Sequence, residues 1–144
     1  MEEVKKRQIT VVIAVIINEK DQIFFTQRSD PGSPYDQKWE LPGGKIEHGE
    51  LPTEALIREI KEETGYLVRI EQLLPIETAM HAFDLQVIMI PYLCSIVEGS
   101  FSAEDKKILD GKFMTIEEMK DHEFLPRDTE IAISALAAHK HLKS

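Results

Sequence analysis

The 144-residue sequence predicts an α/β fold in which a mixed β-sheet is sandwiched between α-helices (α/β/α). Two observations indicate this class. Short apolar, β-branched segments typical of strands occur on both sides of a helical pattern at 51–64. The composition, 42% hydrophobic and 30% charged, is that of a globular protein, and the length suits one hydrophobic core. We therefore expect a single domain over residues 1–144.

The first half of the chain is expected to hold two strands, a loop, a tight turn and a helix. Residues 8–18 and 22–28 are rich in β-branched and aromatic side chains and are separated by a short polar turn. Segment 29–37 contains two prolines and a glycine, which predicts a loop. Gly43-Gly44 predicts a tight turn, and apolar residues recur at helical spacing over 51–64.

The second half is expected to hold strands at 67–80, 85–97 and 109–114, a short helix after Thr115 and a final helix over 127–141. Gly65 is the expected C-cap of the helix before these elements. The segment Thr115-Ile-Glu-Glu has the form of a capping box. Segment 99–107 is expected to be a loop. The final helix is expected to turn Ile131, Ala135 and Leu136 towards the core.

Charge and composition bear on partners and location. A net charge of −9 disfavours tight binding to long nucleic acid, which requires a basic face. It permits a small polyphosphate substrate, because an acidic site can hold Mg²⁺. No apolar run reaches the roughly 18 residues of a membrane span, so no membrane contact is expected. The single cysteine, Cys94, lies in a strand pattern, where we expect a small core residue rather than a nucleophile. A single cysteine also fits a cytoplasmic protein.

Three carboxylates lie together on one side of the helix expected at 51–64, next to its apolar face. On a helical wheel, Glu62 lies roughly 60° to one side of Glu59 and Glu63 roughly 40° to the other. Like charges at this spacing repel one another, so the cluster is explained if divalent cations lie between the carboxylates. The alternative is a solvated helix face in a Glu-rich protein.

Neighbouring residues favour a metal site over the solvated face. Arg58 adjoins the carboxylates, and Glu50 precedes the helix within reach of the guanidinium. Such a pair would fix the orientation of metal ligands. Gly43-Gly44 lets backbone groups approach a metal or a phosphate without obstruction by a Cβ atom.

These residues stand at the spacings of the Nudix box, Gly-x5-Glu-x7-Arg-Glu-U-x-Glu-Glu-x-Gly-U, where U is aliphatic. The matching residues are Gly44, Glu50, Arg58, Glu59, Ile60, Glu62, Glu63 and Gly65. Tyr66 departs from the pattern at the last aliphatic position, which is a packing site. The preceding segment 39–47 is similar to the one that leads into the box in MutT-like members. The chain thus resembles the Nudix hydrolases, and the resemblance implies the Nudix fold.

The resemblance implies a Mg²⁺ site, with Mn²⁺ as an alternative ion, whose ligands are Glu59, Glu62, Glu63 and the carbonyl of Gly43. Arg58 and Glu50 would orient these ligands. The chemistry implied is attack of water on a phosphorus of a nucleoside diphosphate linked to a further group. Bound Mg²⁺ would activate the water and neutralise the leaving phosphate.

A further carboxylate often serves such enzymes as the base or as an extra ligand. The resemblance places Glu104 and its neighbour Asp105 in the expected part of the chain, and Glu47 is a weaker candidate. Acids in loops are also commonly just solvated, so this interpretation stays open for all three.

The resemblance also suggests residues that bind the substrate. Arg28 resembles an arginine that contacts phosphate or base, although it is equally explained as a surface charge at a strand end. Lys45 follows the glycine turn within reach of a phosphate. Asp128 resembles an Asn or Asp that reads the purine edge in MutT-type enzymes, and its alternative role is helix N-capping. Phe83, Phe113 and Trp39 are candidates for stacking on a base or for the core.

The leading hypothesis is a MutT-like pyrophosphohydrolase that converts a nucleoside triphosphate, such as 8-oxo-dGTP, to monophosphate and pyrophosphate. One alternative is cleavage of ADP-ribose or another nucleoside diphosphate derivative. An alternative of another class is a nucleotide-sensing Nudix module without catalysis, against which every acidic position of the box is intact. The expected partner is a small nucleotide, and the protein is expected to be a monomer or a homodimer.

Overall fold

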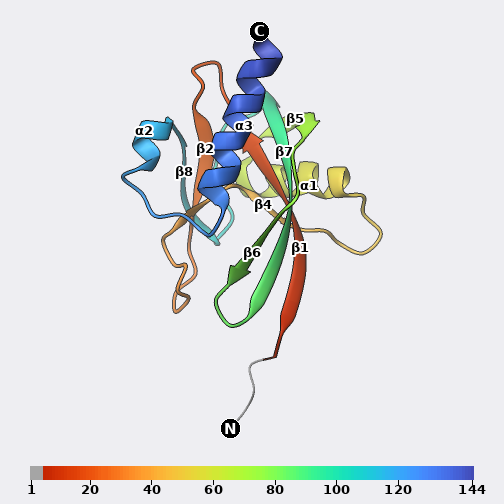
Figure 1. The fold of residues 1–144 in the computed structure, drawn as a ribbon, viewed down its shortest axis with the longest axis vertical. Coiled ribbons are helices and arrows are strands. Elements are labelled where there is room, and N and C mark those ends of the chain that lie inside the picture. The colour runs from red at the N-terminus through yellow and green to blue at the C-terminus, as the bar shows by residue number, and fades with distance from the viewer. Residues whose placement is uncertain (1–4) are drawn as a thin grey trace.

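The computed structural model describes residues 5–144 and contains eight strands and three helices (Figure 1). The strands are β1 (Arg7–Ile16), β2 (Ile23–Arg28), β3 (Trp39–Glu40), β4 (Gly43–Lys45), β5 (Leu67–Leu73), β6 (Glu77–His81), β7 (Leu85–Glu98) and β8 (Ile108–Met114). The helices are α1 (Pro52–Thr64), α2 (Ile116–Met119) and α3 (Asp128–Lys143). Residues 1–4 of the domain expected over 1–144 lie outside the described residues.

The strands form a mixed five-stranded sheet and a separate three-stranded sheet. In the larger sheet the order is β4-β1-β7-β5, and β6 also pairs with β7. β1 and β7 run parallel, whereas β4, β5 and β6 are antiparallel to their partners. The smaller sheet, in the order β3-β2-β8, is antiparallel. The expected mixed sheet is therefore confirmed, and the second sheet is an addition that strand patterns alone did not indicate.

The two faces of β1 explain the layering. Side chains alternate along a strand, so neighbouring residues of β1 point to opposite faces. Ile13 and Val15 belong to one buried cluster, which contains the apolar face of α3. Val12 and Ala14 belong to the other, which contains the apolar face of α1. The larger sheet therefore lies between α1 and α3, which occupy opposite sides of the strands (Figure 1), as the predicted α/β/α fold requires.

Helix α1 has clear start and stop signals. Pro52 occupies the first turn, where its missing N–H costs no hydrogen bond. The Glu54 side chain accepts a hydrogen bond from the Leu51 N–H at 3.1 Å. Gly65 ends the helix at φ 83°, a left-handed conformation that glycine adopts without strain, and its N–H donates to the Lys61 carbonyl at 3.0 Å. The prediction of a helix over 51–64 closed by Gly65 is confirmed to within one residue.

Two predicted elements differ from the structure. The single strand expected over 67–80 is wrong, because Pro75 has no N–H for the ladder and separates β5 from β6. The last helix begins at Asp128 rather than 127, because Arg127 has φ 75°. The capping box at Thr115 is confirmed, since its hydroxyl accepts from the Glu118 N–H at 3.1 Å.

Two expectations drawn from composition can be compared with the structure. Cys94 is buried, and burial raises the pKa of its thiol to about 12. It is therefore a core residue, as predicted. Among residues 5–144, no helix combines the length and the apolar character that crossing a membrane requires.

Candidate active site

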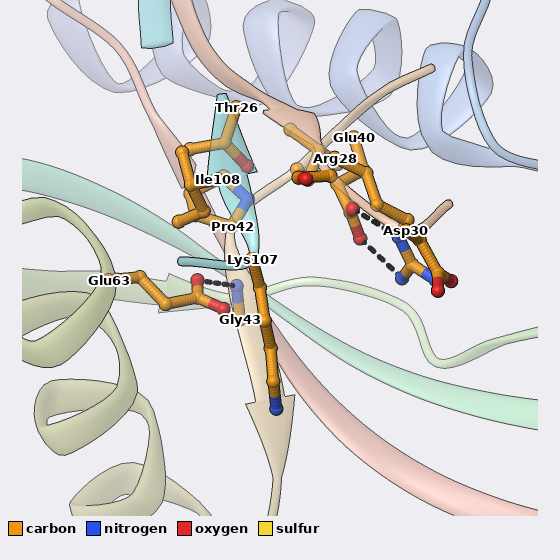
Figure 2. A pocket seen from close by; sticks show the side chains of 11 residues that line it. Thr26, Arg28, Asp30, Glu40, Pro42, Gly43, Glu63, Lys107 and Ile108 are labelled. Atoms are coloured by element: carbon orange, nitrogen blue, oxygen red, sulfur yellow. Dashed lines mark hydrogen bonds and ion pairs between the residues drawn. The ribbon is translucent and has the colours of Figure 1, made fainter. Parts of the chain in front are cut away.

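A cleft lies between the carboxylate side of α1, the glycine turn and the start of β8. It consists of two adjoining cavities of about 340 and about 560 Å³. The residues common to both are Arg28, Glu40, Leu41, Gly43, Glu63 and Lys107. Glu59 and Glu62 of α1 also line the larger cavity, and Figure 2 shows the smaller one from close by. The structure thus brings residues from both sheets and from α1 to one place.

Glu59 and Glu63 reach from α1 to the glycine turn. The Gly43 N–H donates to Glu63 Oε2 at 3.0 Å, the contact drawn in Figure 2. A Cβ atom added at Gly44 would lie 2.5–2.7 Å from the carboxylate atoms of Glu59. Glycine at position 44 therefore lets the turn pack directly against the acidic side of α1.

Arg58 holds the acidic side chains in place. Its guanidinium donates to both oxygens of Glu50, at 2.8 and 2.9 Å. The same group donates to Glu59 at 3.0 Å and to Glu62 at 3.2 Å. A planar guanidinium fixes such partners more rigidly than a lysine would. The expected Arg58–Glu50 pair is present in the structure, and it is coupled directly to two of the predicted metal ligands.

The carboxylates of the cleft have different electrostatic environments. Burial raises the pKa of Glu59 above its ordinary value, although Arg58 opposes this shift. Burial, and then the nearby Glu40, raise the pKa of Glu63 well above its ordinary value. The hydrogen bond from Arg58 lowers the pKa of Glu50 to about 2. The two carboxyls nearest the glycine turn therefore carry unfavourable negative charge that a bound cation would stabilise.

The donor set fits a hard divalent cation. Carboxylate and backbone carbonyl oxygens are ligands that Mg²⁺ prefers. Glu59, Glu62 and Glu63 of α1 supply carboxylates beside a turn without side chains. Within residues 5–144, no three His, Cys, Asp or Glu side chains are gathered as a ready metal-binding group. Glu59 and Glu62 instead accept hydrogen bonds from Arg58, and Glu63 accepts one from the Gly43 N–H. Metal binding by these residues therefore stays a prediction.

Replacing Arg58 by alanine is expected to lower metal-dependent turnover by about 10- to 100-fold, the usual effect of losing a residue that orients metal ligands. The Mg²⁺ concentration for half-maximal activity should rise, because Glu59 and Glu62 lose their shared partner. A Mg²⁺ titration of the rate checks this. Arg69→Ala, on β5, provides a control. Unchanged Mg²⁺ dependence in Arg58→Ala would show that the arginine does not position ligands.

Arg28 is paired inside the cleft. Its guanidinium donates to the two carboxylate oxygens of Glu40 at 2.7 and 2.9 Å (Figure 2). Asp30 approaches the same group at 3.6 Å. These contacts raise the pKa of Arg28, with the Glu40 hydrogen bond as the main cause. Arg28 thus lines the cleft as expected for a substrate-binding residue, but acidic side chains already occupy its guanidinium.

Asp128 is a buried carboxyl that joins α3 to the cleft. Its Oδ2 accepts a hydrogen bond from the Leu41 N–H at 2.9 Å. The N-cap of α3 is Arg127, which makes no side-chain cap, so the capping interpretation of Asp128 is wrong. Burial raises the pKa of Asp128 well above its ordinary value. Asp128 lines the larger cavity, where its proposed contact with a base stays a prediction.

The Asp128 environment predicts a pH-dependent stability difference. Because the folded-state pKa is raised, the associated stability is present below the unfolded pKa and is lost as pH rises through the folded pKa. Asp128→Asn keeps an acceptor for the Leu41 N–H and removes the buried charge, so it should unfold at a temperature equal to or above that of the native protein at pH 8. Asp128→Ala should be less stable by about 1–3 kcal/mol. The unfolding temperatures of both variants and the native protein, measured at pH 5 and pH 8, test these expectations. A lower Tm for Asp128→Asn at pH 8 would contradict this.

The other predicted residues occupy different parts of the cleft. Asp105, Glu47 and Lys45 line the larger cavity. Glu104 is exposed and is not among the lining residues. Of the two neighbouring acids considered as base, Asp105 is therefore the one that lines the cleft.

The aromatic candidates do not line either cavity. Trp39 is buried in the core, and Phe113 packs against Phe24 with ring centroids 5.1 Å apart. Phe83 is exposed in the turn between β6 and β7. The structure therefore favours the core interpretation for Trp39 and Phe113 and leaves Phe83 on the surface.

Sequence patterns missed several residues of the cleft. Glu40, Lys107 and His81 line it. An apolar floor is formed by Ile9, Val11, Ile13, Leu85, Val87 and Met89. Alternation along β1 and β7 could have indicated this floor, because the two strands pair in parallel and present these side chains on one face.

Comparison with known proteins agrees with this geometry. The family model for the NUDIX domain matches residues 6–133. The 8-oxo-dGTP diphosphatase of Haemophilus influenzae is 47% identical over 60 residues, which are 42% of this chain and 43% of that protein. The ADP-ribose pyrophosphatase of Methanocaldococcus jannaschii is 29% identical over 123 residues, covering 82% of this chain and 71% of that protein. The alignment with the Haemophilus protein thus spans less than half of its length.

A solved structure supports the fold over nearly the whole chain. The NUDIX hydrolase from Nitrosomonas europaea has a TM-score of 0.79 and 23% identity, covering 93% of this chain and 91% of the other. The expected Nudix fold is therefore confirmed. Because the NUDIX domain model extends over most of the sequence and includes all of α1, the chain belongs to the NUDIX domain family.

Proposed function

We propose that the protein is a Mg²⁺-dependent pyrophosphohydrolase that converts a nucleoside triphosphate to monophosphate and pyrophosphate, with 8-oxo-dGTP as its favoured substrate. The observation that carries this proposal is the packing of Glu59 and Glu63 against the glycine turn, with Arg58 and Glu50 beside them. The named activity of the Haemophilus relative supports the choice of substrate.

The chain's own residues have distinct roles in this proposal. Glu59, Glu62, Glu63 and the Gly43 carbonyl would hold Mg²⁺. Bound Mg²⁺ supplies positive charge for the phosphate oxygens and lowers the pKa of water. Arg58 keeps Glu59 and Glu62 oriented towards the cleft. Asp105, which lines the larger cavity, would accept the proton of the attacking water.

The nucleoside would lie in the larger cavity. Its apolar floor, formed by β1 and β7, suits the face of a base, and Asp128 offers a carboxyl oxygen for the base edge. Only one oxygen of Asp128 has a hydrogen-bond partner among the described residues, the Leu41 N–H. This arrangement supports the role suggested for Asp128 in reading a purine.

ADP-ribose is the second candidate substrate. The Methanocaldococcus relative named for that activity aligns with a much larger share of this chain than the Haemophilus relative does. In ADP-ribose the diphosphate lies between two sugars, whereas a nucleoside triphosphate ends in a free terminal phosphate. The two candidate substrates therefore differ in negative charge at the end opposite the base.

Turnover of a nucleotide panel with Mg²⁺ tests the proposal. The panel contains 8-oxo-dGTP, dGTP, the other common triphosphates and ADP-ribose, and products are identified chromatographically. The expected result is the highest kcat/KM for 8-oxo-dGTP, with the monophosphate as nucleotide product. Cleavage of ADP-ribose alone would replace the triphosphate proposal with the second candidate. Binding without turnover of any compound would favour a nucleotide-sensing module.

A further inference from the structure

The cations of the cleft differ in how fully they are paired. Glu40 and Asp30 occupy the guanidinium of Arg28, and Arg58 is bonded to Glu50, Glu59 and Glu62. Among residues 5–144, neither Lys45 nor Lys107 forms a salt bridge. Of these two lysines, only Lys107 lines both cavities. Lys107 is therefore the unpaired positive charge at the junction of the cavities.

The backbone of Lys107 is fixed although its side chain is not paired. The Ser29 N–H donates to the Lys107 carbonyl at 2.8 Å. The Lys107 N–H donates to Asp105 Oδ1 at 2.9 Å. The next residue, Ile108, starts β8 by pairing with Arg28. The ammonium group thus extends from an anchored position, and Figure 2 shows its side chain extended beside the glycine turn that also contacts Glu63.

The two cavities suit different ends of a nucleotide. The apolar floor of β1 and β7 lines the larger cavity only. The smaller cavity is lined mainly by charged and polar groups, among them Lys107 and Glu63. Its size, about 340 Å³, leaves room for a phosphate group beside Glu63, one of the proposed metal ligands. An anionic substrate that places its base over the apolar floor would therefore place its charged end here.

We propose that Lys107 binds the terminal phosphate of the nucleoside triphosphate and selects substrates that carry such a phosphate. This inference rests on the proposed function, since it assigns one end of that substrate to the smaller cavity. Arg28 cannot take this role without breaking its two hydrogen bonds to Glu40. Lys45 lines only the larger cavity, so it is placed to contact the other phosphates of the nucleotide.

The test compares Lys107→Met with Lys106→Met, which removes the same charge from the adjacent exposed residue outside both cavities. Inorganic pyrophosphate with Mg²⁺ is the probe, and calorimetry gives its Kd. A charge-assisted hydrogen bond to phosphate corresponds to about 10- to 100-fold in Kd. Lys107→Met should therefore weaken binding at least about tenfold, Lys106→Met should change it less than about twofold, and Lys107→Arg should retain most of the affinity.

Steady-state kinetics supply a second readout. Lys107→Met should raise KM for the triphosphate with little change in kcat, and should leave KM for ADP-ribose nearly unchanged. Equal pyrophosphate affinity in native protein and Lys107→Met, or equal losses in both methionine variants, would overturn the role of Lys107. Undetectable binding of pyrophosphate to the native protein would also overturn it. A selective loss of pyrophosphate binding in a protein that turns over no triphosphate would support the phosphate site and refute the proposed catalysis.

Discussion

Glu62→Gln and Glu63→Gln are each expected to reduce Mg²⁺-dependent turnover by about 10²- to 10³-fold, because each loses a metal-binding charge without a change in volume. The fold should persist in both variants. Glu62 is exposed, and among residues 5–144 its carboxylate has a hydrogen bond and ion pair with Arg58 alone. At Glu63 the amide oxygen of glutamine can still accept the Gly43 N–H. Initial rates at saturating nucleotide over a series of Mg²⁺ concentrations measure the effect.

The matched control is Glu98→Gln, which removes one exposed carboxylate at the end of β7, away from both cavities. This control should retain full activity, and circular dichroism should give the same spectrum for all three variants. Near-native activity of Glu62→Gln or Glu63→Gln at low Mg²⁺ would refute the assignment of that residue as a ligand.

Alanine at the two neighbouring glycines is expected to produce two different defects. A Cβ atom at Gly43 would clash with the backbone carbonyl oxygen of Val12 and lie 2.8 Å from the Ile13 Cα. Because these are backbone atoms of a paired strand, they can move aside only at a large cost in energy. Gly43→Ala should therefore lose about 3 kcal/mol of unfolding free energy. At Gly44 the Cβ atom would meet the Glu59 carboxylate at 2.5 Å, which a flexible side chain can avoid by moving.

Gly44→Ala should therefore fold with at most about 1 kcal/mol of destabilisation but lose about 10- to 100-fold in activity, because Glu59 is displaced. Urea unfolding and initial rates separate the two defects. A pair of variants with equal stability, or a fully active Gly44→Ala, would contradict the close contact between the turn and α1.

The sequence predicted best those features that depend on residues close together in the chain. The start and end of α1 follow from Pro52 and Gly65, and the carboxylate spacing follows from helical geometry, so α1 and its acidic side could be predicted closely. The boundary between β5 and β6 was missed, although Pro75 was a visible signal for it. The second sheet depends on the pairing of β2 with β8, which are about 80 residues apart, and local patterns do not encode that pairing.

The same distinction applies to the site. The Arg58–Glu50 pair was accessible from sequence because both residues belong to one helix and its entry. The contact of Asp128 with Leu41 joins residues 87 positions apart, and only the folded chain shows it. Lys107 lies at the edge of a loop without any motif, and its place at the cleft depends on how β8 meets β2.

The proposed function requires that the acidic side of α1 support hydrolysis of a diphosphate bond. Phosphorus NMR of 8-oxo-dGTP incubated with the protein and Mg²⁺ tests it most directly, with the Glu63→Gln protein alongside. The native protein should release monophosphate and pyrophosphate in equal amounts, and the Glu63→Gln protein should release almost none. Orthophosphate as the primary product, or equal pyrophosphate from both proteins, would contradict it.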